Sequence, residues 1–272
     1  VTPFAQGAVD RNTFAALCKR QLEAGVAGLV PCGTTGETPA LTDTEWADLV
    51  STAVEVSDGS VPVIAGCGSN STAKTVATIT RARNLGADAA LVVFPYYNKP
   101  NPDGLKAHVE ACCRCNLPIV LYHVPGRTGQ LLGVEQLADL CRIDGVVAIK
   151  EATGDLSLGQ RLLNRTDRAV LSGDDFSFAA LMVMGGAGTI SVLSNIAPEM
   201  TVEWANAAQT GDLDTLRRLR HKLLPVVEYL FADTNPVPAK AAMAAMGLCN
   251  DEMRLPLAPG RAPETTLLGG LR

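Results

Sequence analysis

Short apolar runs recur along the chain, separated by segments with helical periodicity. The runs are residues 28–33 (GLVPCG), 62–68 (PVIAGCG), 89–97 (AALVVFPYY), 118–124 (PIVLYHV), 146–152 (VVAIKEA), 169–175 (AVLSGDD) and 188–194 (GTISVLS). The segments between them include residues 43–57 (DTEWADLVSTAVEVS) and 102–116 (PDGLKAHVEACCRCN). Strands almost free of polar residues that alternate with helices are typical of a parallel sheet buried on both faces. With "VTPF" at residues 1–4 as the end of a first strand, the pattern predicts an α/β protein with a (β/α)8 TIM barrel.

The strand pattern stops after residue 196. The remainder predicts a small C-terminal helical region of about three helices, broken near Gly211 and at Asn235-Pro236. We therefore expect a barrel with the active site over residues 1–196 and a helical region over 197–272. The broad apolar faces of these helices need a cover, either the barrel or a neighbouring subunit, which favours a homo-oligomer.

Composition and charge narrow the class of protein. The 272 residues are 47% hydrophobic and carry a formal charge of −5, which gives no electrostatic reason to expect nucleic acid or an anionic membrane as partner. No apolar run reaches the roughly 20 residues of a membrane helix. The start, VTPFAQG, has no features of a secretory signal, and its abruptness predicts that a short N-terminal piece is missing.

The cysteines and histidines do not form a metal motif. Three of the eight cysteines cluster at Cys112, Cys113 and Cys115, but no second pair stands at ligand spacing. We expect buried, reduced thiols in a cytosolic protein, and no protein-bound catalytic metal.

The apolar run that begins at Val146 ends on a cation, Lys150. In a TIM barrel the chemistry lies at the carboxyl ends of the strands, and Tyr122 stands one βα unit earlier, so the two side chains should lie side by side. Strand alternation sends Glu151 to the opposite face. A lysine in a dry barrel mouth beside a phenol, with no adjacent carboxylate, suits carbonyl attack and Schiff-base formation. The alternative is a lysine that reaches solvent or pairs with another acid.

Two other strand ends carry candidate polar groups. The stretch CGTTGE, residues 32–37, could bind a carboxylate or oxyanion through its backbone N–H groups and the hydroxyls of Thr34 and Thr35, or could be an ordinary turn. It is not a phosphate-binding P-loop, and we interpret Ser69–Ser71 as a helix cap. Tyr96 and Tyr97 could relay a proton together with Tyr122 and the threonines, or could simply pack.

Four motifs, GLVPCGTTGE, YYNKP, YHVPGRT and VAIKEATGD, together resemble the dihydrodipicolinate synthase and N-acetylneuraminate lyase family of class I, pyruvate-dependent aldolases. The resemblance runs from Val1 to about Leu257. It implies a Schiff-base-forming lyase without cofactor or metal. Within the family the chain looks most like the branch that condenses pyruvate with L-aspartate 4-semialdehyde to 4-hydroxy-tetrahydrodipicolinate, in lysine and diaminopimelate biosynthesis.

The resemblance also assigns roles to residues. Lys150 would form the imine with pyruvate, Thr34 and Thr35 would hold its carboxylate, and Tyr122, Thr34 and Tyr97 would form the proton relay, with Tyr97 reaching across from a neighbouring subunit. Arg127 would bind the carboxylate of aspartate semialdehyde, and Gly173 and Ile190 would line the pocket. The protein would be a cytoplasmic homotetramer whose partners are these small-molecule substrates.

Departures from the family pattern leave alternatives open. His123 stands where Asn or Asp is more common, which leaves room for another lyase or aldolase acting on a sugar acid or other 2-keto acid. A non-catalytic ligand-binding barrel is a further alternative. Some relatives bind lysine as a feedback inhibitor; the matching positions here look like Asp43, Trp46 and Lys74, and a cation at Lys74 predicts an enzyme insensitive to lysine.

Overall fold

The computed structural model describes residues 1–271. Contacts divide the chain into two compact units: one comprises Val1–Val63 and the residues from Ser191 onward, and the other comprises Ile64–Ile190. The expected boundary between a barrel and a helical region at residue 196 stays a prediction.

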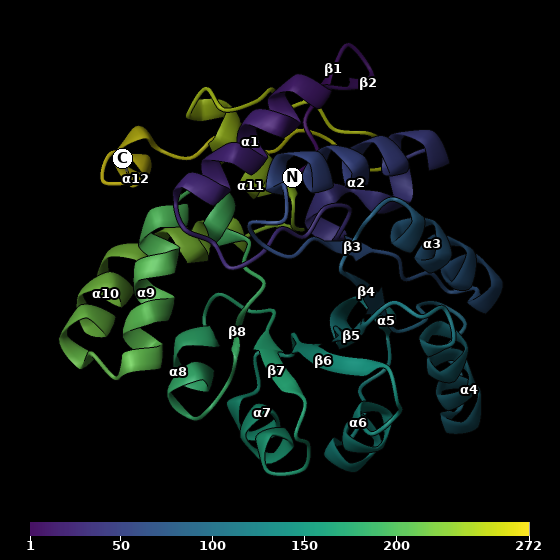
Figure 1. Ribbon diagram of the computed structural model, residues 1–272. Coiled ribbons are helices and arrows are strands. Elements are labelled where there is room, and N and C mark those ends of the chain that lie inside the picture. The colour runs from purple at the N-terminus through teal and green to yellow at the C-terminus, as the bar shows by residue number, and fades with distance from the viewer. Residues whose placement is uncertain (272) are drawn as a thin grey trace. The chain divides into compact units, whose positions relative to one another are not determined.

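The second unit is built on a six-stranded parallel sheet. Its strands are β3 (Ile64–Gly66), β4 (Ala89–Val93), β5 (Ile119–His123), β6 (Val146–Glu151), β7 (Ala169–Ser172) and β8 (Gly188–Thr189), paired in chain order. Its helices are α3 (Thr72–Asn84), α4 (Pro102–Cys113), α5 (Pro125–Thr128), α6 (Val134–Cys141), α7 (Leu156–Leu163) and α8 (Phe178–Val183). Figure 1 shows the longer helices on the outer side of the strands. Consecutive parallel strands joined by helices are the expected βα repeat of the barrel.

Burial on both faces explains the apolar strands. The consecutive residues Ala90 and Leu91 in β4 and Ile119 and Val120 in β5 are all buried, and consecutive residues of a strand point to opposite faces of the sheet. The predicted cap at the start of α3 is confirmed, because the Ser71 hydroxyl accepts from the backbone N–H of Lys74 at 3.5 Å.

The first unit holds the remaining helices. They are α1 (Arg11–Glu23), α2 (Asp43–Ser57), α9 (Pro198–Thr210), α10 (Leu213–Leu230), α11 (Val237–Ala245) and α12 (Thr265–Leu268). The predicted breaks are confirmed: Gly211 ends α9 in the left-handed conformation at φ 75°, and α11 begins directly after Pro236, which lacks an N–H. The short α12 was not expected.

Two expected strands differ in the structure. Residues 1–4 do not form a parallel strand; β1 (Phe4–Ala5) instead pairs antiparallel with β2 (Ala8–Val9). The connecting Gln6-Gly7 has positive φ at both residues, as a tight hairpin turn requires. Of residues 28–33, only Leu29 pairs, in a single parallel bridge to Val63. Pro31 cannot donate to a ladder, and Cys32 has a left-handed backbone at φ 56°, so the strand stops.

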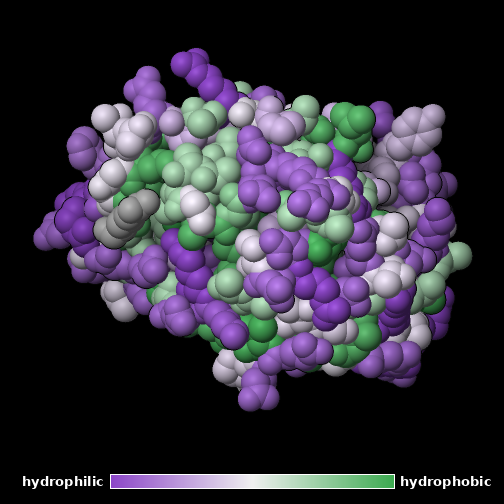
Figure 2. Space-filling model, turned by 90° about the horizontal axis from the view of Figure 1, so that it is seen from above, coloured by the Kyte–Doolittle hydropathy of each residue, from purple (hydrophilic) through white to green (hydrophobic). Residues whose placement is uncertain are grey.

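All eight cysteines, each within residues 1–271, are free, as predicted. Burial raises the pKa of Cys112 to about 12, which keeps that thiol protonated. In the same range no three His, Cys, Asp or Glu residues are arranged to hold a metal ion. None of the described helices has the length and apolar character needed to cross a membrane. On the face drawn in Figure 2, hydrophilic residues lie between smaller hydrophobic groups.

Candidate active site

Tyr122 and Lys150 are direct neighbours at the carboxyl ends of β5 and β6. They are register partners in the parallel pair, and the Lys150 Nζ lies 4.3 Å from the centroid of the Tyr122 ring. Both side chains are nearly buried, at 6% and 9% exposure for Tyr122 and Lys150. The juxtaposition predicted from the spacing of the two residues is therefore confirmed. An amine held against an aromatic face has restricted access to water and a phenol within reach.

Gly173 makes room for the lysine side chain. A Cβ placed on Gly173 would lie 2.5 Å from Lys150 Cε and 2.7 Å from Ala152 Cβ, closer than real Cβ contacts. The Gly173 N–H donates to the Glu151 carbonyl at 2.7 Å, which fixes the glycine backbone beside β6. Position 173 thus requires glycine because the lysine occupies the space of any larger residue.

Glu151 and His123 occupy the opposite face. The Glu151 Oε1 lies 3.5 Å from His123 Nδ1 and accepts from the N–H of Thr153 at 2.8 Å. His123 Nε2 accepts from the N–H of Leu132 at 3.2 Å, which places the imidazole proton on Nδ1, facing the carboxylate. His123 is fully buried. The prediction that Glu151 points away from Lys150 is confirmed. His123 lies on the same face as Glu151 and not on the face of Tyr122 and Lys150.

The remaining candidates of the second unit lie on loops or, in the case of Arg127, in the short helix α5. Tyr97 is 89% exposed and has a left-handed backbone at φ 72°. Arg127 lies exposed in α5. The side-chain N–H of Gln130 donates to the Pro100 carbonyl at 2.8 Å, which ties the loop of Arg127 to the loop of Tyr97. The Ile190 N–H donates to the Ser172 carbonyl at 2.9 Å, so Ile190 follows β8 beside the end of β7.

Thr34 and Thr35 belong to the first unit, in a 3-10 turn, Thr34–Gly36. The N–H groups of Gly36 and Glu37 are used within the turn, because they donate to the carbonyls of Gly33 and Thr34. A carboxylate would therefore meet the N–H and hydroxyl groups of the two threonines. The side-chain N–H of Asn235 donates to Thr35 Oγ1 at 3.0 Å. Since that bond uses a lone pair of the oxygen, the Thr35 proton stays available to a ligand.

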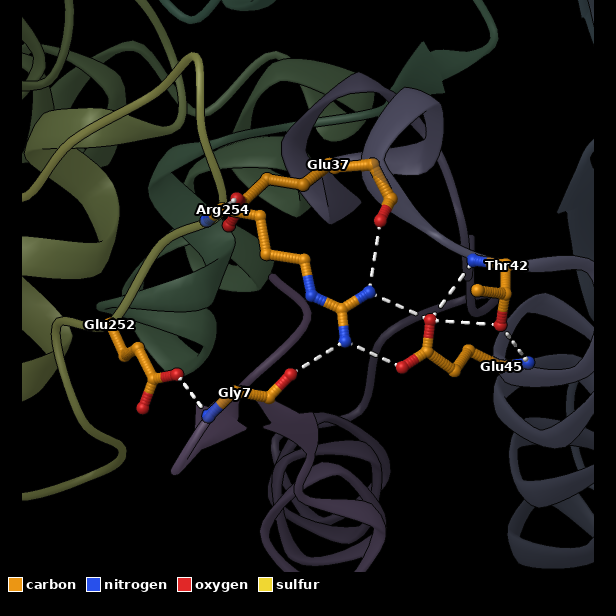
Figure 3. Close-up of polar contacts among 7 residues, drawn as sticks. Gly7, Glu37, Thr42, Glu45, Glu252 and Arg254 are labelled. Carbon is orange, nitrogen blue, oxygen red and sulfur yellow. Dashed lines mark hydrogen bonds and ion pairs between the residues drawn. The ribbon is translucent and has the colours of Figure 1, made fainter.

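Two cations of the C-terminal segment bind residues close to this turn in the sequence. Lys240 donates to a carboxylate oxygen of Glu37, and both side chains are buried. Figure 3 shows the Arg254 guanidinium between the Glu45 carboxylate and the Gly7 backbone carbonyl. The fully buried ring of Phe4 contacts both cations, with Lys240 Nζ 4.3 Å and Arg254 Cζ 4.5 Å from its centroid.

Sequence reasoning missed these anchors. Asn235, Lys240 and Arg254 stand in segments that read as helix or loop, and their contacts join residues about two hundred positions apart. One signal was present: a lysine within the alanine-rich run PVPAKAAMAA would be buried, and a buried cation needs a partner.

The chain is similar to proteins of one known family. It matches the Dihydrodipicolinate synthetase family over residues 1–268. The chain belongs to this family. The 4-hydroxy-tetrahydrodipicolinate synthase of Hyphomonas neptunium is 48% identical over 273 residues, covering 98% of this chain and 93% of the relative.

Solved structures agree with this membership in the dihydrodipicolinate synthetase family. The dihydrodipicolinate synthase of Thermotoga maritima superposes with a TM-score of 0.93 at 42% identity, covering 99% of this chain and 92% of that one. The synthase of Acinetobacter baumannii, solved as a complex with pyruvate, has a TM-score of 0.93 at 38% identity, covering 100% of this chain and 94% of that one. The expected family, barrel fold class and lyase class are therefore confirmed.

Proposed function

We propose that the protein condenses pyruvate with L-aspartate 4-semialdehyde to give 4-hydroxy-tetrahydrodipicolinate, in lysine and diaminopimelate biosynthesis. The observation that carries the proposal is the Lys150 amine, 4.3 Å from the centre of the Tyr122 ring and packed against Gly173. A buried amine beside a phenol suits carbonyl attack, and the family membership identifies the carbonyl compound as pyruvate.

The chemistry requires only side chains and substrates. The Lys150 amine adds to the ketone carbon of pyruvate, and loss of water gives an imine. The imine nitrogen withdraws electrons, so a proton leaves the methyl group and an enamine forms. The enamine carbon bonds to the aldehyde carbon of the second substrate, whose oxygen takes up a proton. The amine of that substrate then attacks the imine carbon, closes the ring and releases Lys150.

The other candidate residues divide the remaining tasks. Thr34 and Thr35 hold the pyruvate carboxylate through hydroxyl and backbone N–H groups. Tyr122 and Thr34 pass protons to and from the reacting atoms, with Tyr97 as the third hydroxyl of the relay. Arg127 binds the carboxylate of aspartate semialdehyde, because its planar guanidinium can make two parallel hydrogen bonds.

The pocket and the assembly complete the proposal. Gly173 and Ile190 line the pocket, Ile190 through its backbone carbonyl. The protein acts as a cytoplasmic homotetramer in which Tyr97 reaches a neighbouring subunit. The 89% exposure of this tyrosine supports that role, since a large aromatic side chain standing in water gains no burial within its own chain. Sedimentation equilibrium of the purified protein tests it: a mass four times the 28.5 kDa of the chain supports the tetramer, and a monomer mass contradicts it.

The decisive experiment follows consumption of pyruvate and aspartate semialdehyde together, with Lys150→Ala as control. We expect turnover by the wild type and none by the variant. Borohydride reduction in the presence of pyruvate should attach the substrate to Lys150. A wild type that traps pyruvate but does not consume the semialdehyde would contradict the role of Arg127 and favour a sugar-acid aldehyde. Failure to trap pyruvate would contradict the Schiff base and favour a ligand-binding barrel.

A further inference from the structure

Glu37 ends the turn that carries Thr34 and Thr35. Its backbone is left-handed, at φ 54° and ψ 34°, and its N–H donates to the Thr34 carbonyl at 3.1 Å. On the other side of the turn, Cys32 is also left-handed, at φ 56°. Such a backbone is unfavourable for residues other than glycine and persists only where the surroundings hold it. Contacts from surrounding residues must therefore hold Glu37 in this conformation.

The Glu37 side chain is fully engaged away from any ligand. One carboxylate oxygen accepts from Lys240 Nζ, and the other accepts from the backbone N–H of Arg254 at 3.3 Å. Lys240 also donates to the Glu252 carbonyl at 2.8 Å. With exposures of 2% for Glu37 and 0% for Lys240, neither charge reaches water. Burial lowers the pKa of Lys240, and the contact with Glu37 opposes that shift, so the pair is the main support of the charged amine.

Stability alone is a weak reason for this pair. Exchanging a buried ion pair for well-packed apolar side chains is often neutral or stabilising, because removing two charges from water is costly. The pair instead fixes a conformation. Its charged hydrogen bond holds Glu37, the strained residue that ends the turn of Thr34 and Thr35. A second tie from the same segment, the Asn235 bond to Thr35, reaches the turn directly.

We propose that Lys240 is a positioning residue, which acts through Glu37 to hold Thr34 and Thr35 in the geometry that binds the substrate carboxylate. The proposal rests on the proposed function, since it takes the pyruvate carboxylate as the ligand of this turn. It differs from a structural role because its loss affects one substrate selectively.

The test uses the double variant Glu37→Gln/Lys240→Met, which removes both charges and leaves neither buried alone. We expect the KM for pyruvate to rise about tenfold, with the KM for aspartate semialdehyde changed less than twofold. The pyruvate concentration that gives half-maximal borohydride trapping should rise by the same factor. Arg218→Met is the matched control, because it breaks an exposed ion pair with Glu203 in the same unit and should leave both KM values unchanged.

Glu37→Asp is the second variant. It keeps the charge pair but shortens the anchor by one methylene, so it decides the question if the double variant does not fold. A higher pyruvate KM with an unchanged semialdehyde KM supports the proposal. Unchanged pyruvate KM values in folded variants overturn it, and equal rises for both substrates reduce Lys240 to a structural role. A wild type that neither traps nor consumes pyruvate overturns the proposed function as well, so the two failures are distinguishable.

Discussion

At the scale of single residues, Lys150 has room for its side chain because Gly173 has none. The lysine side chain runs along the Gly173 backbone, and a methyl group there would lie 2.5 Å from Lys150 Cε. A lysine Cε can move, but Ala152 Cβ, at 2.7 Å from the same point, limits where it can go. The position of the amine over the Tyr122 ring therefore depends on the glycine.

Gly173→Ala should displace the amine and lower kcat by at least about tenfold, since misplacing a reacting group by about 1 Å can cost a hundredfold. Steady-state kinetics and borohydride trapping measure the effect. Gly133→Ala is the matched control, because its Cβ would lie 3.9 Å from the closest atom, Gln136 Oε1. Unchanged trapping in Gly173→Ala would contradict the steric argument.

His123 departs from the family pattern without facing the reactive side. It is fully buried and is bonded to Leu132 N–H on the face opposite Lys150. His123→Ala should lower the free energy of unfolding by about 2–3 kcal/mol, because a buried N–H loses its acceptor and a cavity opens. The preference for aspartate semialdehyde over sugar-acid aldehydes should stay the same. Denaturant unfolding and rates with both aldehydes test this; a switched preference would falsify the assignment.

The sequence predicts the reactive face well because that prediction needs only the period of a strand. Alternation separates Lys150 from Glu151, and one βα unit separates Tyr122 from Lys150. The contacts of Lys240 and Asn235 could not be predicted in the same way. They depend on where the C-terminal segment packs, which no local period encodes.

At the scale of elements, the helices whose ends are set by local residues are predicted correctly. The strands at residues 1–4 and 28–33, whose formation depends on a pairing partner, are not. The three C-terminal helices follow from their apolar periodicity and from breaks at Gly211 and Pro236. The first expected strand fails because the left-handed Gln6-Gly7 turn closes a hairpin, and an apolar run alone does not say which partner it pairs with. The β2 residues Ala8–Val9 gave too short a signal to be noticed.

The start of α2 is joined to the C-terminal segment by Arg254 and Glu45. Hydrogen bonds from Arg254 lower the pKa of Glu45 to about 2, from an ordinary value of 4.5, and bonds from Thr42 add to this effect. A carboxylate with a depressed pKa in the folded state stabilises the fold above its unfolded pKa, and this contribution is lost as the pH falls from about 4.5 towards 2.

Arg254→Met should therefore destabilise the protein by about 2 kcal/mol at neutral pH, with the difference from the wild type shrinking below pH 4.5. Chemical denaturation at a series of pH values measures it. Arg142→Met, which breaks an exposed pair with Asp139, is the control and should cost under about 0.5 kcal/mol. A difference that stays constant into acid would show that packing of Arg254 on Phe4, not charge, is responsible.

At the scale of the whole molecule, the distribution of charge affects whether free lysine can bind and inhibit the enzyme. The chain carries a net charge of −5, which attracts a cation such as free lysine only weakly, because salt screens exposed charges beyond about 10 Å. Binding of lysine would depend on local groups. Lys74 stands exposed in the first turn of α3, where its ammonium repels the amino groups of an incoming lysine.

We therefore expect activity to be unaffected by low-millimolar lysine, measured as the initial rate of semialdehyde consumption at subsaturating pyruvate. Lys74→Glu is the informative variant: it replaces the repelling cation with a carboxylate that attracts an ammonium, and it should make the rate more sensitive to lysine at low ionic strength than at high. Arginine at the same concentrations controls for a general cation effect. Clear inhibition of the wild type by lysine but not arginine would mean that other groups outweigh Lys74, and the charge argument would be wrong.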